Sequence, residues 1–411
     1  MKADGPSQAR AAADSAARTA YGKLVAILAR RCGDLAAAED ELADAFAKAL
    51  EVWPRSGVPD RPDAWLLTTA RRRLTDLARR TAVRAKAKPE LALLMERLGA
   101  AAETGRLPDE RLALMLTCAD PAIDAALHTP LMLQAVLGLE AARIGSAFLV
   151  SPAAMGQRLA RGKAKIRAAG LAFETPGVEA LSVRLAPVLQ AIYAAYSAGY
   201  DLVGEDPAKA HDLSEEALYL ARLVAGLSPG AANAHGLLAL VAHCEARAPQ
   251  RRSLGGVFIP LGQQDPSHWD AALIDEAETA LRRALSLAPP GRFALEAAIQ
   301  SVHAERRRTG TTNWRAAAAL YDRLVETGAG LGAHIARACA HGEAYGSGAA
   351  LDQLAVLEKE TGDHQPFHAA RAHWLAAAGR AGEARAAYAH AATLSADPSV
   401  RAFLQGRAAQ L

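Results

Sequence analysis

Hydrophobic positions recur every three or four residues along most of the chain, which is the period of an amphipathic α-helix. Between residues 18 and 53 two apolar stripes follow one another. The first consists of Leu24, Ile27, Leu28 and Leu35, and the second of Leu42, Ala45, Phe46, Ala49 and Leu50. After a proline-rich loop over 54–62, a third stripe, over 63–80, consists of Trp65, Leu66, Ala70, Leu74 and Leu77. The pattern predicts three helices in this part of the chain.

The stretch 141–167 reads as a helix-turn-helix. We expect Ile144 and Phe148 to point inward from its first helix, with residues 149–150 closing the turn. Ser151 can cap the second helix, and Pro152 occupies its first position, where no backbone N–H is needed. Met155, Leu159 and Ile166 form an apolar face, and the rest of that helix is basic, with no acidic residue between Ser151 and Arg167. A basic recognition helix suits DNA in a major groove, and the alternative is a solvated basic face.

Further helices are predicted on both sides of this motif. Asp109 can cap a helix that carries Leu112, Leu114, Met115 and Leu116, and Pro130 should kink the next helix, over 124–137, or mark its start. From about residue 178 helical pairs are expected at 182–226, 231–247, 270–304, 313–340, 349–376 and 381–409. Tyr321, Leu354 and Tyr388 recur at about 34 residues, the period of tetratricopeptide repeats. The insert 251–270 is either a partner-contact site or a connecting loop.

Composition and charge favour a helical protein and indicate which part of the chain meets nucleic acid. Alanine is abundant and aromatic residues make up only 5% of the chain, which favours closely packed helices. The net charge is +3, but the first 170 residues are basic and the remainder is mildly acidic, so we expect only the front to meet nucleic acid. The four cysteines lie far apart without metal-ligand spacing, and neither a signal peptide nor a membrane span is evident. A cytoplasmic location is therefore expected.

Catalytic chemistry has little support in the sequence. No P-loop, Rossmann glycine fingerprint or nucleophile elbow is present, so we expect no enzyme and no cofactor. His364 and His368 are four residues apart and could share a helix face, but Pro366 lies between them and no zincin motif accompanies them. Exposed or capping histidines are the preferred interpretation, and no metal site is predicted.

Several ordered segments resemble a known family. AEDELADAF (38–46) and GVPDRPDAWLLTTARRR (57–73) resemble region 2 of bacterial extracytoplasmic-function sigma factors. TCADPAI (117–123) and AFLVSPAAMGQRLARGKAKIRAAG (147–170) resemble region 4 of a group of these proteins that carries a long TPR-like extension. The later part of the chain resembles that extension through AIYAAYSAGY (191–200), QQDPSHWD (263–270), TNWRAAAALYDRL (312–324) and HAARAHWLAAAGRAGEARAAYAHA (368–391).

The resemblance implies an all-α fold with two small sigma-type helical domains, the second a helix-turn-helix, followed by a TPR-like helical-repeat domain. We divide the chain into a disordered arm (1–17), region 2 (18–82), a linker (83–108), region 4 (109–172) and a regulatory extension (178–411). Region 2 would bind core RNA polymerase and the −10 promoter element, and region 4 would bind the −35 element. The extension would take the place of a separate membrane anti-sigma factor.

The resemblance also places binding residues. The polymerase contact falls on acidic residues around one aromatic, with helix capping and core packing as the alternative: Glu39, Asp40, Glu41, Asp44 and Phe46. Contacts to the melted −10 strand fall on Arg71, Arg72 and Arg73, with Asp60 and Arg61 in the base-capturing loop, whereas Trp65 is expected in the core. The −35 duplex would be read by Ser151, Ala153, Ala154 and Gln157, with phosphates held by Arg158, Arg161, Lys163 and Lys165.

Some positions depart from the family pattern. Ala43 stands where glutamine is typical, Arg72 where asparagine is typical, and TCADPA lacks the second cysteine of TCCHPA. In region 4, Glu140, Arg143 and Ser146 replace the usual threonine, glutamate and arginine-like residues. Two hypotheses remain: a sigma factor whose extension docks on the front of the chain or binds a protein or ligand, and a sigma-like mimic or adaptor that binds a regulator without initiating transcription.

Overall fold

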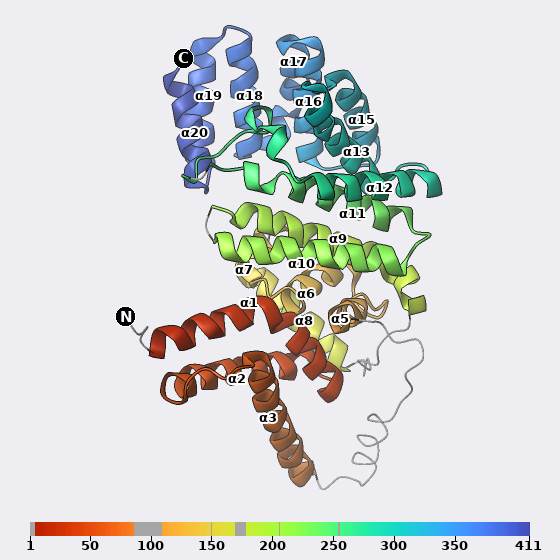
Figure 1. The fold of residues 1–411 in the computed structure, drawn as a ribbon, viewed down its shortest axis with the longest axis vertical. Helices are drawn as coiled ribbons and strands as arrows, with labels where there is room; N and C mark the ends of the chain where they lie inside the picture. Colours follow the sequence, from red (N-terminus) through yellow and green to blue (C-terminus); the bar gives the residue numbers. More distant parts are fainter. Residues whose placement is uncertain (1–4, 86–108, 149, 169–177, 205, 254) are drawn as a thin grey trace. The chain divides into compact units, whose positions relative to one another are not determined.

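The computed structural model describes residues 5–85, 109–148, 150–168, 178–204, 206–253 and 255–411 (Figure 1). Within these ranges the protein is built from α-helices and short 3-10 turns, with one isolated antiparallel bridge between Arg252 and Phe258. The chain divides into two compact units, the first containing residues 1–200 and 209–213 and the second 201–208 and 214–411. The all-α class predicted from the hydrophobic pattern is confirmed.

Three long helices open the first unit: α1 (Gly5–Cys32), α2 (Leu35–Ser56) and α3 (Pro62–Ala85). The expectation of a disordered arm is wrong over residues 5–17, because α1 runs through them and buries Ala9, Ala13 and Ala16. The hydrophobic pattern did not predict this part of the helix because its buried face has no large apolar side chain. Closely packed alanines bury the face instead. The expected loop over 54–62 is also shorter, because α2 continues through Pro54 and ends at Gly57, whose φ is +84°.

The second half of this unit contains α5 (Glu110–Cys118), α6 (Ala125–Ala135), α7 (Ala141–Ala147), α8 (Pro152–Ala168) and α9 (Val178–Leu202). The Asp109 side chain caps α5 by accepting a hydrogen bond from the Arg111 N–H at 2.7 Å, as predicted. Pro130 lies inside α6 and is buried there. The linker expected over 83–108 lies outside the described residues beyond Ala85.

The two halves of this unit pack closely together. Gly22 of α1 is buried, and a Cβ at this position would overlap the backbone carbonyl of Val136, just after α6. Arg30 of α1 also pairs with Glu110 of α5. Only glycine permits this approach of one backbone to another, so α1 positions α5 and α6 relative to α2 and α3.

The second unit is an array of helices joined by short turns. After α10 (Pro207–Leu227), which belongs partly to each unit, and α11 (Ala232–Ala246), the array consists of α12 (Ala271–Leu287), α13 (Arg292–Ala304), α14 (Arg306–Thr309), α15 (Trp314–Glu326), α16 (Leu331–Tyr345), α17 (Ser347–Thr361), α18 (Gln365–Ala377), α19 (Ala381–Leu394) and α20 (Pro398–Ala409). These bounds follow the predicted helical pairs closely, except that the stretch 231–247 holds the single helix α11 where a pair is predicted. The second compact unit begins at Asp201, whereas the predicted extension begins at residue 178.

The insert 251–270 packs within its own unit. It contains the 3-10 turns η2 (Leu261–Gln263) and η3 (Pro266–His268), and the turn η1 (Ala248–Gln250) precedes it. Arg252 pairs with Asp397 at the start of α20, and the Phe258 N–H donates to the Ser399 hydroxyl at 2.6 Å. The insert therefore ties the beginning of the array to its last helix.

No helix in the described part of the chain combines the length and the apolar character needed to cross a membrane.

Candidate polymerase and DNA interface

Helix α2 presents the predicted acidic surface. The Asp34 side chain caps the helix by accepting hydrogen bonds from the backbone N–H groups of Ala36 and Ala37, at 3.0 and 3.2 Å. Leu42, Ala45 and Ala49 are buried on one face, so the acidic residues fall on the others. Among the predicted polymerase contacts, two are exposed and three are half-buried: Asp40 and Asp44 in the first group, and Glu39, Glu41 and Phe46 in the second.

One of the predicted DNA cations pairs with this acidic surface. Arg73 of α3 donates from Nε to Glu41 at 2.7 Å and also contacts the Asp44 carboxylate. Two of the five expected polymerase contacts are thus paired with a side chain expected to bind DNA. Because Arg73 and Asp44 are about half exposed, this pairing contributes little to stability and can exchange for another partner.

Of the other predicted −10 residues, Asp60 and Arg61 directly precede α3, and Arg71 and Arg72 lie near its middle. Asp60 and Arg61 are exposed, and the Arg61–Asp63 ion pair is long, at 3.9 Å. Arg72 is exposed, whereas Arg71 is half-buried and its Nε is buried without a hydrogen-bond partner. Cationic side chains therefore remain open at the surface for a nucleic acid backbone.

Trp65 packs into region 2 as expected rather than standing free. Its ring meets the buried ring of Trp53 edge to face, with centroids 5.4 Å apart. The pair joins the end of α2 to the first turn of α3 and holds the intervening loop in place. Trp65 is half-buried, so it packs beneath this loop and does not present a fully exposed ring on which bases could stack.

Helices α7 and α8 lie in the stretch 141–167, where a helix-turn-helix is predicted. Ile144, Met155, Leu159 and Ile166 are buried, and the Ser151 hydroxyl accepts a hydrogen bond from the Ala154 N–H at 3.3 Å. Phe148 departs from the expectation of an inward side chain, since 39% of it is exposed at the end of α7. The helix ends there, so Phe148 no longer lies on its buried stripe. Leu149 lies outside the described residues.

The sharp turn between the two helices depends on Gly145. Its carbonyl accepts a hydrogen bond from the Val150 N–H at 2.8 Å, and a Cβ at this position would lie 2.6 Å from the Val150 carbonyl oxygen. The turn leaves the start of α8 at the surface. Of the predicted −35 residues, Ser151, Ala153, Gln157, Arg158, Arg161 and Lys165 are exposed, and Ala154 and Lys163 are half-buried.

Lys163 is the exception among these cations, because it faces α2. Its ammonium pairs with the Glu39 carboxylate, and only 15% and 11% of the two side chains are exposed. Arg167, one turn further along α8, forms a fork-shaped pair with Asp34, with nitrogen–oxygen distances of 2.6 and 3.0 Å. The acidic helix α2 and the basic helix α8 are therefore joined within the first unit.

Burial dominates the electrostatics of this contact. It raises the pKa of Glu39 above the usual value for glutamic acid, and the nearby Lys163 lowers that pKa only in part. The Glu39 Oε1 atom is also buried without a hydrogen-bond partner. Desolvation thus offsets much of the attraction between the two charges, so the contact can be opened at modest cost.

The contact between α2 and α8 was missed by the sequence reasoning. Glu39 and Lys163 were each predicted as binding residues, but for different partners, and they are 124 positions apart. No periodicity links positions at that distance. The sequence relates the two helices only through their charges, because one is acidic and the other basic. That complementarity does not show which residues pair.

Helix α9, at the start of the predicted extension, also contacts the segment predicted to be region 4. Arg184 of α9 pairs with Asp120 at 2.7 Å and donates to the carbonyl of Leu116 at the same distance. Arg18 of α1 pairs with Asp212 of α10 at 3.0 Å, again within the first unit. Helices α9 and α10 are therefore attached to both halves of the first unit.

Comparisons with known proteins agree with the resemblance for part of the chain. Residues 17–84 match the family Sigma-70 region 2, and residues 184–285 match a family of unknown function, DUF6596. An uncharacterized protein of Rhizobium meliloti (strain 1021) is 33% identical over 401 residues, which cover 95% of this chain and 94% of that protein. No solved structure matches the chain.

Proposed function

Because this chain belongs to the same family as the Rhizobium meliloti protein and carries a sigma-70 region 2 domain, we propose that it is an alternative sigma factor of the extracytoplasmic-function type. It binds core RNA polymerase, directs it to promoters and has no catalytic activity of its own. The observation that carries the proposal is the sigma-70 region 2 match at residues 17–84, in a chain whose helix α8 also exposes a basic face.

The polymerase contact is assigned to the exposed part of α2. Asp40 and Asp44 are exposed and Phe46 is half-buried between them and the core, so a basic partner surface would meet charge around an apolar anchor. Arg71 and Arg72 are assigned to the strand opened at the −10 element. The start of α8 is assigned to the −35 duplex, with Arg158, Arg161 and Lys165 on phosphates.

We further propose that the contact between α2 and α8 is a closed form of the factor. In this form Glu39 and Lys163 neutralise each other, as do Asp34 and Arg167. Polymerase would compete for the acidic residues of α2, and DNA would compete for the basic residues of α8. Binding of either partner would therefore break the contact and make the other helix available to its own partner. The attachment of α9 to region 4 through Arg184 gives the extension a route by which it regulates this opening in cis.

Binding to purified core RNA polymerase tests the proposal. We expect the full-length protein to co-elute with core polymerase and the resulting complex to bind promoter DNA with strong salt dependence. Asp40→Lys should weaken polymerase binding at least tenfold by reversing an exposed charge. Glu51→Lys, an exposed acid further along α2, is the matched control and should have a smaller effect.

The same experiment separates the alternative function. A protein that binds core polymerase but gives that complex no affinity for promoter DNA at any salt concentration is a sigma mimic or adaptor. Failure to bind core polymerase at all would overturn the sigma-factor proposal.

A further inference from the structure

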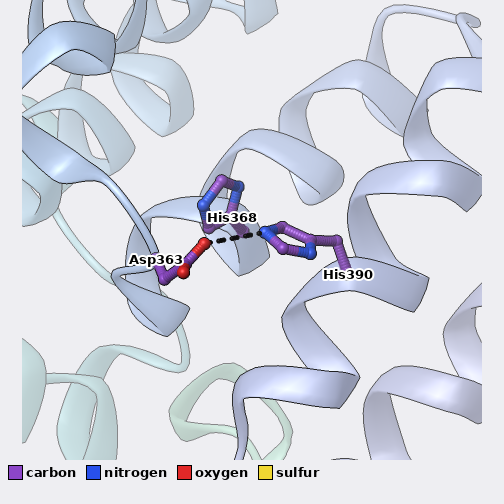
Figure 2. Close-up of side chains that lie close together, drawn as sticks. All are labelled: Asp363, His368 and His390. Atoms are coloured by element: carbon purple, nitrogen blue, oxygen red, sulfur yellow. Dashed lines mark ion pairs between the residues drawn. The ribbon is translucent and has the colours of Figure 1, made fainter.

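Two histidines and one aspartate come together at the end of the helical array (Figure 2). Asp363 lies in the turn between α17 and α18, His368 lies on α18, and His390 lies on α19. Each side chain offers a ligand atom, and these atoms all lie within 4.8 Å of one another. Sequence reasoning considered His364 with His368 as a candidate pair and predicted no metal site. The partner of His368 is His390, which the α18–α19 hairpin brings back from 22 positions further along the chain.

The geometry of the cluster is close to that of a three-ligand metal site. His390 Nε2 lies 3.6 Å from Asp363 Oδ1, and the rings of His368 and His390 meet edge to face with centroids 4.4 Å apart. Ligand atoms bound tetrahedrally to Zn²⁺ at its usual bond lengths are separated by about 3.3 Å. Because 45% of His390 and 82% of Asp363 are exposed, both side chains have room to rotate toward that spacing.

The ring of His368 is held by a hydrogen bond to the backbone. Its Nε2 lies 2.8 Å from the carbonyl oxygen of Gly362. A carbonyl can only accept, so Nε2 carries the proton of this hydrogen bond and Nδ1 retains its lone pair. Metal-binding histidines commonly donate their other ring N–H to a backbone carbonyl in this way. Gly362 has a φ of +46°, a left-handed backbone conformation that lets the chain turn at this position.

We propose that Asp363, His368 and His390 form a binding site for a divalent transition-metal ion of the Zn²⁺ type. Two imidazoles and one carboxylate suit Zn²⁺, Co²⁺ or Ni²⁺, whereas Mg²⁺ and Ca²⁺ prefer oxygen ligands alone. With three protein ligands, the fourth position is open to water or an external ligand. The bound ion joins the α17–α18 turn to α19 and so stabilises the last repeats of the array.

Titration of the full-length, metal-free protein with ZnCl2 and CoCl2 tests the site. We expect one ion whose affinity falls at least tenfold in His390→Gln, and a visible Co²⁺ absorption band of a tetrahedral complex that the same substitution removes. His268→Gln is the matched control, because His268 is exposed and lies 3.3 Å from Asp265 but belongs to a histidine–carboxylate pair without a second imidazole. We expect it to leave both signals unchanged.

Thermal unfolding gives a second readout. Zn²⁺ should raise the Tm of the wild type and of His268→Gln, since a ligand that binds only the folded state stabilises it, and should not raise the Tm of His390→Gln. Equal concentrations of MgCl2 should have no such effect. Equal Zn²⁺ affinity in the His390→Gln and His268→Gln variants, or no Zn²⁺ binding by the wild type, would overturn the proposal.

Discussion

Lys163 of the basic helix α8 forms a largely buried ion pair with Glu39 of the acidic helix α2. The residues belong to the two halves of the first unit, and each was predicted to serve a different macromolecular partner. Desolvation opposes the pairing, so the effect of either single substitution on stability is not fixed in sign. Their coupling is the quantity that the structure predicts.

A double-mutant cycle of Glu39→Gln and Lys163→Met measures that coupling. We expect a coupling free energy of roughly 0.5–3 kcal/mol from denaturant unfolding of the two single variants and the double variant. A parallel cycle on the exposed pair Lys48–Glu51, also on α2, should give a much smaller value. Equal coupling in the two cycles would show that α2 and α8 do not meet in solution.

The raised pKa of Glu39 predicts a pH dependence. Above the usual pKa of glutamic acid the unfolded chain is ionised while the folded protein still holds part of the proton at Glu39. The stabilisation by this proton is complete below that pKa and is lost as the pH rises through the folded-state pKa. The wild type should therefore lose free energy of unfolding relative to Glu39→Gln as the pH rises from about 4.5. A constant difference across this range would contradict the burial of Glu39.

The exposed cations of α8 should set the salt dependence of DNA binding. Arg161→Ala with Lys165→Ala should weaken binding to all DNA sequences and reduce the slope of log affinity against log salt by about 2, since each phosphate contact contributes about 0.9. Arg315→Ala with Lys359→Ala removes the same charge from exposed positions in the second unit and is the control. An unchanged slope in the α8 variant would remove this helix from the DNA interface.

Two glycines near the recognition helix should respond in opposite ways. Gly145→Ala places a Cβ against the Val150 carbonyl and should lower both the Tm and the affinity for DNA. Gly156→Ala, in α8, meets no atom within 4 Å and should be neutral or stabilising by up to about 1 kcal/mol, because alanine favours the helix. Calorimetry on both variants checks this, and equal Tm values would show that the turn is more open than the structure has it.

Much of the fold was accessible from the sequence because it depends on local patterns. The stripe of Met155, Leu159 and Ile166, the Asp109 cap and the helical pairs of the array all follow from positions within a few residues of one another. Helix α1 began earlier than predicted because its buried face consists of alanines, which carry little hydrophobic signal.

The candidate sites were predicted less completely, because their geometry depends on packing between distant segments. Sequence reasoning predicted that Arg73 and Lys163 bind DNA, but it could not show that both form ion pairs with acidic residues of α2. It considered His368 only with His364, its neighbour in sequence, and predicted no metal site there. The structure joins His368 to His390, since the turn after α18 reverses the chain.

Run-off transcription over fragmented genomic DNA, with the purified protein and its cognate core RNA polymerase, tests the central claim most directly. The account predicts discrete start sites that share two upstream sequence motifs and that are lost with Arg161→Ala and Lys165→Ala but kept with Arg315→Ala and Lys359→Ala. Core polymerase that binds the protein yet initiates at no such sites, at low salt and also after opening of the α2–α8 contact by Glu39→Gln, would contradict it.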